Sequence, residues 1–92
     1  MDERQIKRFE RVFKGVANHW RIRILCMIEK NPDITLEGIT EKLKSNYQTT
    51  AEHVRRLSLA GLILKTYHGR AVGHTISPYG LQVLKMMKNF KE

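Results

Sequence analysis

Polar side chains gather on one face of a helix predicted in the middle of the chain. The stretch Asn46–Ile63 reads NYQTTAEHVRRLSLAGLI, and at about 100° per residue it divides into two sectors. The mainly apolar sector contains Tyr47, Thr50, Val54, Leu57 and Gly61. The opposite sector contains Gln48, Thr49, Glu52, Arg55 and Arg56. Amide, hydroxyl and guanidinium groups on one ridge have the chemistry needed to recognise base edges in the major groove of DNA.

These polar side chains suit different parts of a duplex. Glutamine pairs with adenine and arginine with guanine, so Gln48 is a candidate for base recognition and the two arginines for base edges or phosphates. The threonine and the histidine are candidates to donate to phosphate. Glu52 would repel phosphate, so it is expected to accept from a cytosine amino group if it faces DNA. The alternative is an ordinary solvated face. The candidate DNA-binding residues of this helix are Gln48, Thr49, Glu52, His53, Arg55 and Arg56.

The charge of the chain favours a polyanionic partner. The 92 residues carry a formal net charge of +8, and the excess lies in the second half. Residues 1–41 hold eight basic and seven acidic side chains, whereas residues 42–92 hold nine basic and two acidic. A one-sided positive field attracts polyanions at long range. Nucleic acid is the usual polyanion, an anionic membrane surface is the competitor, and a solubilising charge excess is the simplest alternative.

Several further helices are expected to position the polar-faced helix. Apolar residues at helical spacing predict helices over residues 3–16, 19–30, 36–44 and 46–60. The predicted caps are Asn18, Thr35 and either Ser45 or Asn46. Gly61 ends the fourth helix, where a left-handed residue is least costly. A last helix begins at Ser77-Pro78, with serine as the cap and proline in the first turn.

A basic hairpin is predicted between the fourth and the last helix. Leu62–Tyr67 and His74–Ser77 read as strands, separated by a turn over His68–Gly73. Arg70 lies between two glycines at the tip and Lys65 lies on the first strand, so both are candidates for phosphate or a narrow minor groove. A short helix, a polar-faced helix and a hairpin in this order predict one mainly helical (α+β) winged helix-turn-helix domain over residues 1–92.

The chain resembles the ArsR-type winged-helix repressors in several segments. Phe13-Lys14 with Ala17-Asn18, followed by RIRIL from Arg21, resembles their opening, and LEGITEKL from Leu36 is similar to the first helix of their DNA-binding pair. TTAEHVRRL from Thr49, followed by AGLI, resembles their recognition helix and its exit into the wing. SPYG at the last helix is closer to MarR-type relatives. The resemblance covers about residues 9–88.

This resemblance implies a homodimer that inserts the recognition helix into the major groove and extends the wing toward the backbone or minor groove. The terminal helices carry apolar edges that so small a domain is not expected to cover, which also favours a dimer. The candidate dimer residues are Ile6, Phe9, Phe13, Leu81, Leu84 and Met87. Their pairing would place two recognition helices about 34 Å apart, one turn of DNA.

Other classes of function find little support in the sequence. The helix before the turn has no Cys or His, and the last helix has no His, so neither a metal nor another cofactor is expected. No nucleophile with a base, no phosphate loop and no evident carboxylate pair indicate an enzyme. Cys26, the single cysteine, is expected to be an inert core residue. One thiol and no signal sequence indicate the cytoplasm, at the nucleoid if the source is prokaryotic, with no membrane partner.

Two functions therefore remain. The sequence favours a dimeric, sequence-specific regulator of transcription that binds double-stranded DNA, most simply a repressor that occludes a promoter. The alternative is a winged helix used as a protein- or RNA-interaction module, because a fold does not determine a function.

Overall fold

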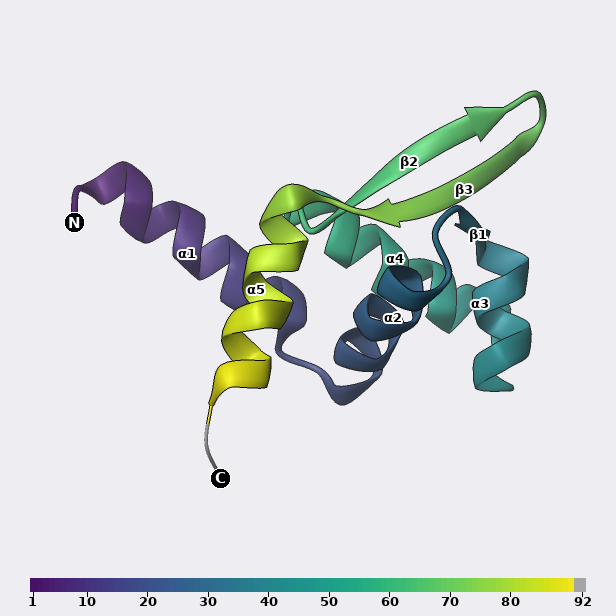
Figure 1. Cartoon of the computed structure of the whole chain (residues 1–92), viewed down its shortest axis with the longest axis horizontal. Coiled ribbons are helices and arrows are strands. Elements are labelled where there is room, and N and C mark those ends of the chain that lie inside the picture. Colours follow the sequence, from purple (N-terminus) through teal and green to yellow (C-terminus); the bar gives the residue numbers. More distant parts are fainter. Residues whose placement is uncertain (91–92) are drawn as a thin grey trace.

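The computed structural model describes residues 1–90, which form five helices and a small antiparallel sheet. In chain order the elements are α1 (Glu3–Val16), α2 (His19–Lys30), β1 (Ile34–Thr35), α3 (Leu36–Leu43), α4 (Tyr47–Leu59), β2 (Ile63–His68), β3 (Ala71–Ile76) and α5 (Pro78–Asn89). The β2–β3 hairpin extends from one end of the molecule and α1 from the other (Figure 1). The predicted fold class, a mainly helical winged helix-turn-helix, is confirmed.

Each of these helices begins at a side chain that accepts a hydrogen bond from a free backbone N–H group of the first turn. At α1, Asp2 and Gln5 form a reciprocal capping box. The other caps are those predicted from the sequence: Asn18, Thr35, Asn46 and Ser77. Local capping therefore fixes where the helices begin, and Gly61, with φ +78°, ends the segment after α4 as expected.

The sheet is larger than the sequence predicts, and its hairpin turn is tighter. The short strand β1 pairs with β3 to give the order β1-β3-β2. The turn is confined to Gly69 and Arg70 rather than extending over His68–Gly73, because the strands pair from Ile63 opposite Ile76 out to His68 opposite Ala71. Gly69, with φ +63°, stands in the first turn position, which type II′ hairpins reserve for glycine.

Gly73 is consequently a strand residue with a packing role. It lies in β3 opposite Thr66 of β2 and Thr35 of β1. A Cβ at this position would overlap the carboxylate of Asp33 in the loop after α2. The absence of a side chain at Gly73 therefore lets this loop pack directly on the hairpin.

Helix α2 lies at the centre of the core. Its Ile24, Leu25 and Ile28 are completely buried, and each such side chain stabilises the fold by about 1.5–3 kcal/mol. Ile22 of the same helix, in contrast, is 37% exposed. Other core side chains come from every remaining helix and from the start of β2: Val12, Val16, Ile39, Val54, Leu57, Leu62, Ile63, Val83 and Leu84.

Candidate nucleic-acid interface

Helix α4 is fixed to the core by one face and exposes the other. Thr50, Val54 and Leu57 are buried. The hydroxyl of Thr50 donates to the backbone oxygen of Asn46 at 2.8 Å and lies 2.6 Å from the hydroxyl of Ser45, so this buried polar group is satisfied. The residues on the opposite face are exposed: Gln48, Thr49, Glu52, Arg55 and Arg56. The polar ridge predicted from the sequence is thus present and accessible.

In the first turn of α4, one residue lies outside the sector that the sequence predicts for it. Tyr47, assigned to the apolar sector, is 49% exposed, and its hydroxyl lies 3.4 Å from Oε1 of Glu37 on α3. Gln48 and Thr49 are beside it on the surface. The amide and hydroxyl expected to lie deepest in a DNA groove are therefore at an exposed helix N-terminus, which also attracts phosphate through its free N–H groups.

Glu52 is bound by both neighbouring arginines. Its Oε1 accepts from Nη2 of Arg55 at 2.7 Å and from Nε of Arg56 at 2.9 Å, while its Oε2 accepts from Nε of Arg55 at 2.9 Å. Hydrogen bonds from Arg55 and then Arg56 lower the pKa of Glu52 to about 2. The carboxylate therefore stays ionised and holds two cations on the ridge, in an arrangement that reduces their combined charge.

His53 is half-buried and connects α4 to the N-terminal helices. Its Nδ1 accepts from Nε of Arg21 at 3.3 Å, so a neutral ring carries its proton on Nε2. Arg21 also donates from Nη1 to the backbone oxygens of Lys14 and Gly15, at 3.0 and 3.3 Å. Burial, followed by the charge of Arg21, lowers the pKa of His53. The sequence gives no signal for this contact, because Arg21 and His53 are 32 residues apart.

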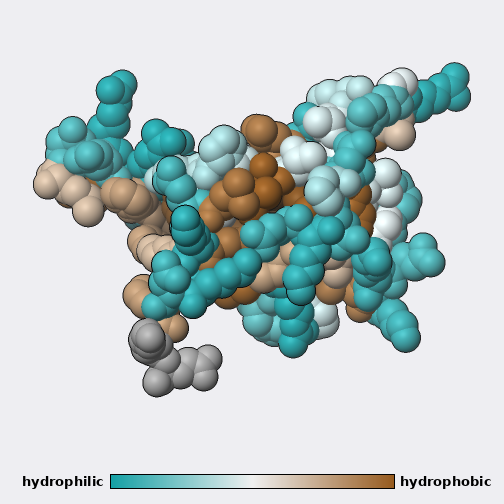
Figure 2. Space-filling view, viewed as in Figure 1, coloured by the Kyte–Doolittle hydropathy of each residue, from teal (hydrophilic) through white to brown (hydrophobic). Residues whose placement is uncertain are grey.

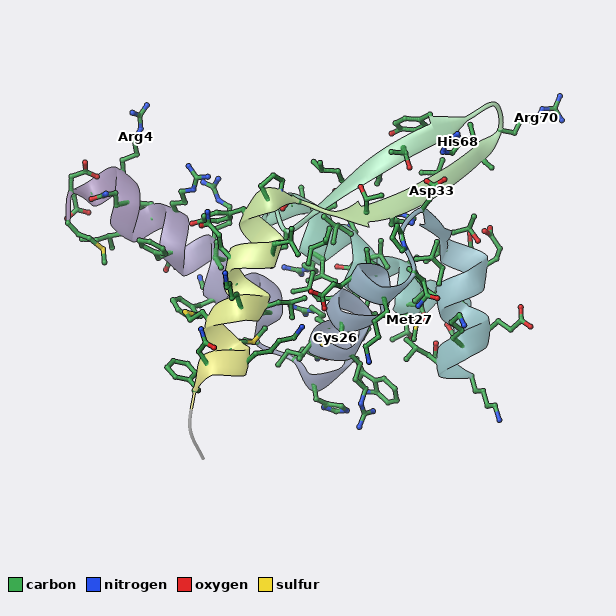
Figure 3. All side chains as sticks on the ribbon, viewed as in Figure 1. Arg4, Cys26, Met27, Asp33, His68 and Arg70 are labelled. Atoms are coloured by element: carbon green, nitrogen blue, oxygen red, sulfur yellow. The ribbon has the colours of Figure 1, made fainter. Side chains whose placement is uncertain are left out.

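The wing presents the two predicted cations. Lys65 is exposed on β2, and Arg70 is exposed in the turn, where it points away from the body of the molecule (Figure 3). A groove of about 300 Å³ lies between the wing and the start of α4, and Tyr47, Lys65 and Arg70 are among its lining residues. The predicted wing residues and the N-terminal end of α4 therefore border one concave surface.

Asp33 anchors the wing from outside the hairpin. One carboxylate oxygen accepts from the hydroxyl of Thr66, and the other lies 2.8 Å from Nε2 of His68 (Figure 3). The hydrogen bond from Thr66, followed by His68, lowers the pKa of Asp33. Its backbone N–H also donates to the oxygen of His74 at 2.9 Å. The sequence gives no signal for these contacts, because Asp33 and Thr66 are 33 residues apart.

Helices α1 and α5 expose most of the apolar edge predicted for a dimer. The exposed fractions are 45% for Ile6, 38% for Phe9, 53% for Phe13 and 45% for Leu81. Figure 2 shows this apolar side of α1 beneath a hydrophilic one. A groove of about 210 Å³ lies along the two helices and is lined in part by both phenylalanines and Met86.

Leu84 is a correction to the predicted dimer residues. It is only 2% exposed, because its side of α5 faces the core rather than the solvent. Met87 is half-buried and packs against the same core. The neighbouring Met86 is 37% exposed and lines the α1–α5 groove.

Three other features bear on function: possible metal ligands, membrane-spanning helices and the single cysteine. Nowhere in residues 1–90 do three or more His, Cys, Asp or Glu side chains gather in an arrangement that would hold a metal ion. None of the helices in this part of the chain combines the length and the apolar character needed to cross a membrane. Cys26 is a free thiol, half-buried against the core.

Comparison with known proteins agrees with the winged helix-turn-helix arrangement of the helices and the hairpin. Residues 19–63, from α2 to the start of β2, match the family described as winged helix-turn-helix DNA-binding. No curated protein matches the sequence.

Similar solved structures extend the comparison to nearly the whole chain. The homodimeric winged helix-turn-helix DNA-binding domain of Mb0332 from Mycobacterium bovis, described as a possible ArsR-family regulator, has a TM-score of 0.81 at 21% identity, covering 96% of this chain and 83% of that one. HlyU from Vibrio cholerae has a TM-score of 0.79 at 21% identity, covering 95% and 94%. MarR has a TM-score of 0.74 at 15% identity, covering 85% and 62%.

The resemblance to the ArsR-type winged-helix proteins predicted from the sequence is therefore confirmed, and MarR is also among the similar structures. At these identities the solved structures establish the fold. The chain is a winged helix-turn-helix domain with the fold of the ArsR-type regulators, and its residues 19–63 have the sequence pattern of the winged helix-turn-helix DNA-binding family.

Proposed function

We propose that this protein is a sequence-specific DNA-binding regulator of transcription. Helix α4 enters the major groove, and the wing contacts the backbone or the minor groove. The observation that carries this proposal is the polar ridge of α4, which is exposed on a helix whose other face is buried in the core. Gln48 at the N-terminal end is assigned to base edges, while Thr49 beside it and Arg70 and Lys65 of the wing are assigned to phosphate.

A salt titration tests the proposal against its rival, a protein- or RNA-interaction module. Binding to a duplex enriched from random DNA and to random duplex is measured by fluorescence anisotropy from 50 to 300 mM salt. A regulator loses affinity steeply with salt and prefers the enriched duplex by about 10³-fold or more. Equal and weak binding to both duplexes would instead favour the interaction module.

We further propose that the active form is a homodimer and that it represses transcription by occluding a promoter. The exposed apolar residues of α1 and α5 support the dimer, since a second copy would cover them. The homodimeric state of the Mb0332 domain from Mycobacterium bovis supports the same assembly. A promoter fragment that contains the selected site should give less transcript in vitro when the protein is added. An increase in transcript would indicate an activator.

A further inference from the structure

A second basic surface lies on α1, outside the α4 ridge and the wing. A groove of about 580 Å³ runs between the N-terminal half of α1 and the end of α4. Its lining includes four basic residues and no acidic one: Arg4, Lys7, Arg8, Arg11, Leu59, Ala60, Gly61 and Tyr79. The charge count of the sequence hides this surface, because the acidic residues of the first half lie elsewhere. The basic groove is therefore identified by the charges of its lining residues, and not by the count of basic and acidic residues in each half of the sequence.

The cations of this groove are positioned by packing and are not neutralised. Gly15 of α1 lies directly against Ala60, which holds α1 across the end of α4. The guanidinium of Arg8 stacks 4.5 Å from the centre of the Tyr79 ring. In the described residues 1–90, the ion pair recorded on α1 joins Glu10 to Lys14, and none involves the four cations of the groove.

This basic groove is continuous with the polar ridge of α4. An adjoining groove of about 450 Å³ is lined by Arg11, Lys14 and Arg56, so cations of α1 and α4 share one surface. Arg4 projects from the α1 end of the molecule and Arg70 from the wing end (Figure 3). The longest dimension of the molecule is 41 Å, which exceeds the roughly 34 Å of one DNA turn.

The chemistry of the groove fits a phosphodiester backbone. Four unpaired cations attract phosphates, and the exposed side chain of Leu59, 62% accessible, offers an apolar contact for deoxyribose. Since the apolar edge of the same helix is assigned to the dimer contact, the basic side of α1 would lie near the two-fold axis. We propose that the α1 groove binds backbone phosphates in the spacer between the two half-sites, an inference that rests on the proposed function.

The test combines a charge variant with neutralised DNA. Arg4→Gln/Lys7→Gln removes two cations, and Lys30→Gln, at the exposed end of α2, is the matched control. Each protein is titrated with the enriched duplex carrying either natural phosphates or neutral methylphosphonates in the spacer. In the double variant the salt slope should fall by about 2 for each protomer, or about 4 for the dimer, while the preferred bases stay the same. Neutral spacer linkages should weaken the wild type and the control several-fold, and should weaken the double variant clearly less, because only Arg8 and Arg11 remain in its groove.

Two outcomes would overturn the inference without touching the proposed function. In the first, the double variant has the same salt slope and affinity as the Lys30→Gln control, while the wild type still prefers the enriched duplex. The second is an unchanged wild-type affinity on the neutralised spacer together with a loss of poly-glutamate binding in the double variant, which would assign the groove to an acidic protein. Failure of the wild type to prefer any duplex would instead refute the proposed function itself.

Discussion

The carboxylate of Glu52 lowers the net positive charge of the α4 ridge. Its carboxylate holds Arg55 and Arg56 in place, and it brings a negative charge to a surface that should meet phosphate. Three residues that together carry one net positive charge attract a polyanion less than two free arginines do. Glu52 therefore restrains non-specific binding and leaves more of the affinity to base recognition.

Replacing Glu52 with glutamine should strengthen binding to random duplex several-fold and raise the salt slope by about 1 for each protomer, because both arginines become free to meet phosphate. Glu41→Gln on the exposed side of α3 is the matched control. Anisotropy titrations at several salt concentrations measure both quantities. Unchanged affinity for random duplex, with a lost preference at one C·G pair, would show that Glu52 reads cytosine instead.

Arg70 differs from the α4 arginines, because it is a single exposed cation in the turn of the β2–β3 hairpin. Arg70→Ala should weaken binding to every sequence by a similar factor and lower the salt slope by about 1 for each protomer, or about 2 for the dimer. Lys30→Ala removes the same charge from the exposed end of α2, outside the hairpin turn, and should leave the slope unchanged. A slope in Arg70→Ala equal to that of the wild type would remove Arg70 from the DNA contacts.

At the scale of elements, Arg21 connects three helices. From the start of α2 it donates to the end of α1 and to His53 on α4. The helix assigned to the dimer and the helix assigned to DNA are thus joined through one side chain. Because the pKa of His53 is lowered in the fold, the neutral ring is the form that the folded state favours.

The sign of the pH effect follows from that shift. Unfolded histidine has a pKa near 6.5, so its contribution to stability is complete above this value and is lost as the pH falls through the lower folded pKa. Urea denaturation between pH 5 and 8 should show the wild type losing stability toward pH 5. The variant His53→Gln should lose less over the same range. Parallel curves for the two proteins would contradict this role.

Much of the element structure follows from local signals. The caps Asn18, Thr35, Asn46 and Ser77 are predictable because capping acts over two or three residues. The polar ridge of α4 is predictable from helical periodicity alone. Its ion pairs also follow a local rule, since Glu52 lies three and four residues before the two arginines.

Non-local contacts account for the differences. The strand β1 has only two residues and exists because it pairs with β3, more than thirty residues later. Gly73 has the composition of a turn residue, yet it is glycine because Asp33 packs against it. Periodicity does not decide between neighbouring apolar residues of one helix, so Leu84 is predicted at a dimer edge although it lies in the core.

At the scale of the whole molecule, the apolar edge of α1 and α5 should control assembly. Phe13→Glu places a charge on a side chain that is 53% exposed, so it should block the dimer while leaving the monomer folded. Light scattering at micromolar concentration should give a monomer mass for this variant and a dimer mass for the wild type. Leu64→Glu, at a similarly exposed apolar position on the wing, should remain dimeric. A wild-type monomer, or a dimeric Phe13→Glu protein, would contradict the proposed assembly.

The most direct measurement is a selection from random duplex DNA, carried out in parallel with the wild type and with Gln48→Ala. The wild type should enrich one motif with two-fold symmetric half-sites whose centres are about one DNA turn apart. The variant should enrich the same motif with one base pair relaxed in each half-site, a cost of roughly 1–3 kcal/mol at that position. Enrichment of no sequence by the wild type, or an identical motif from both proteins, would contradict base recognition by the α4 ridge.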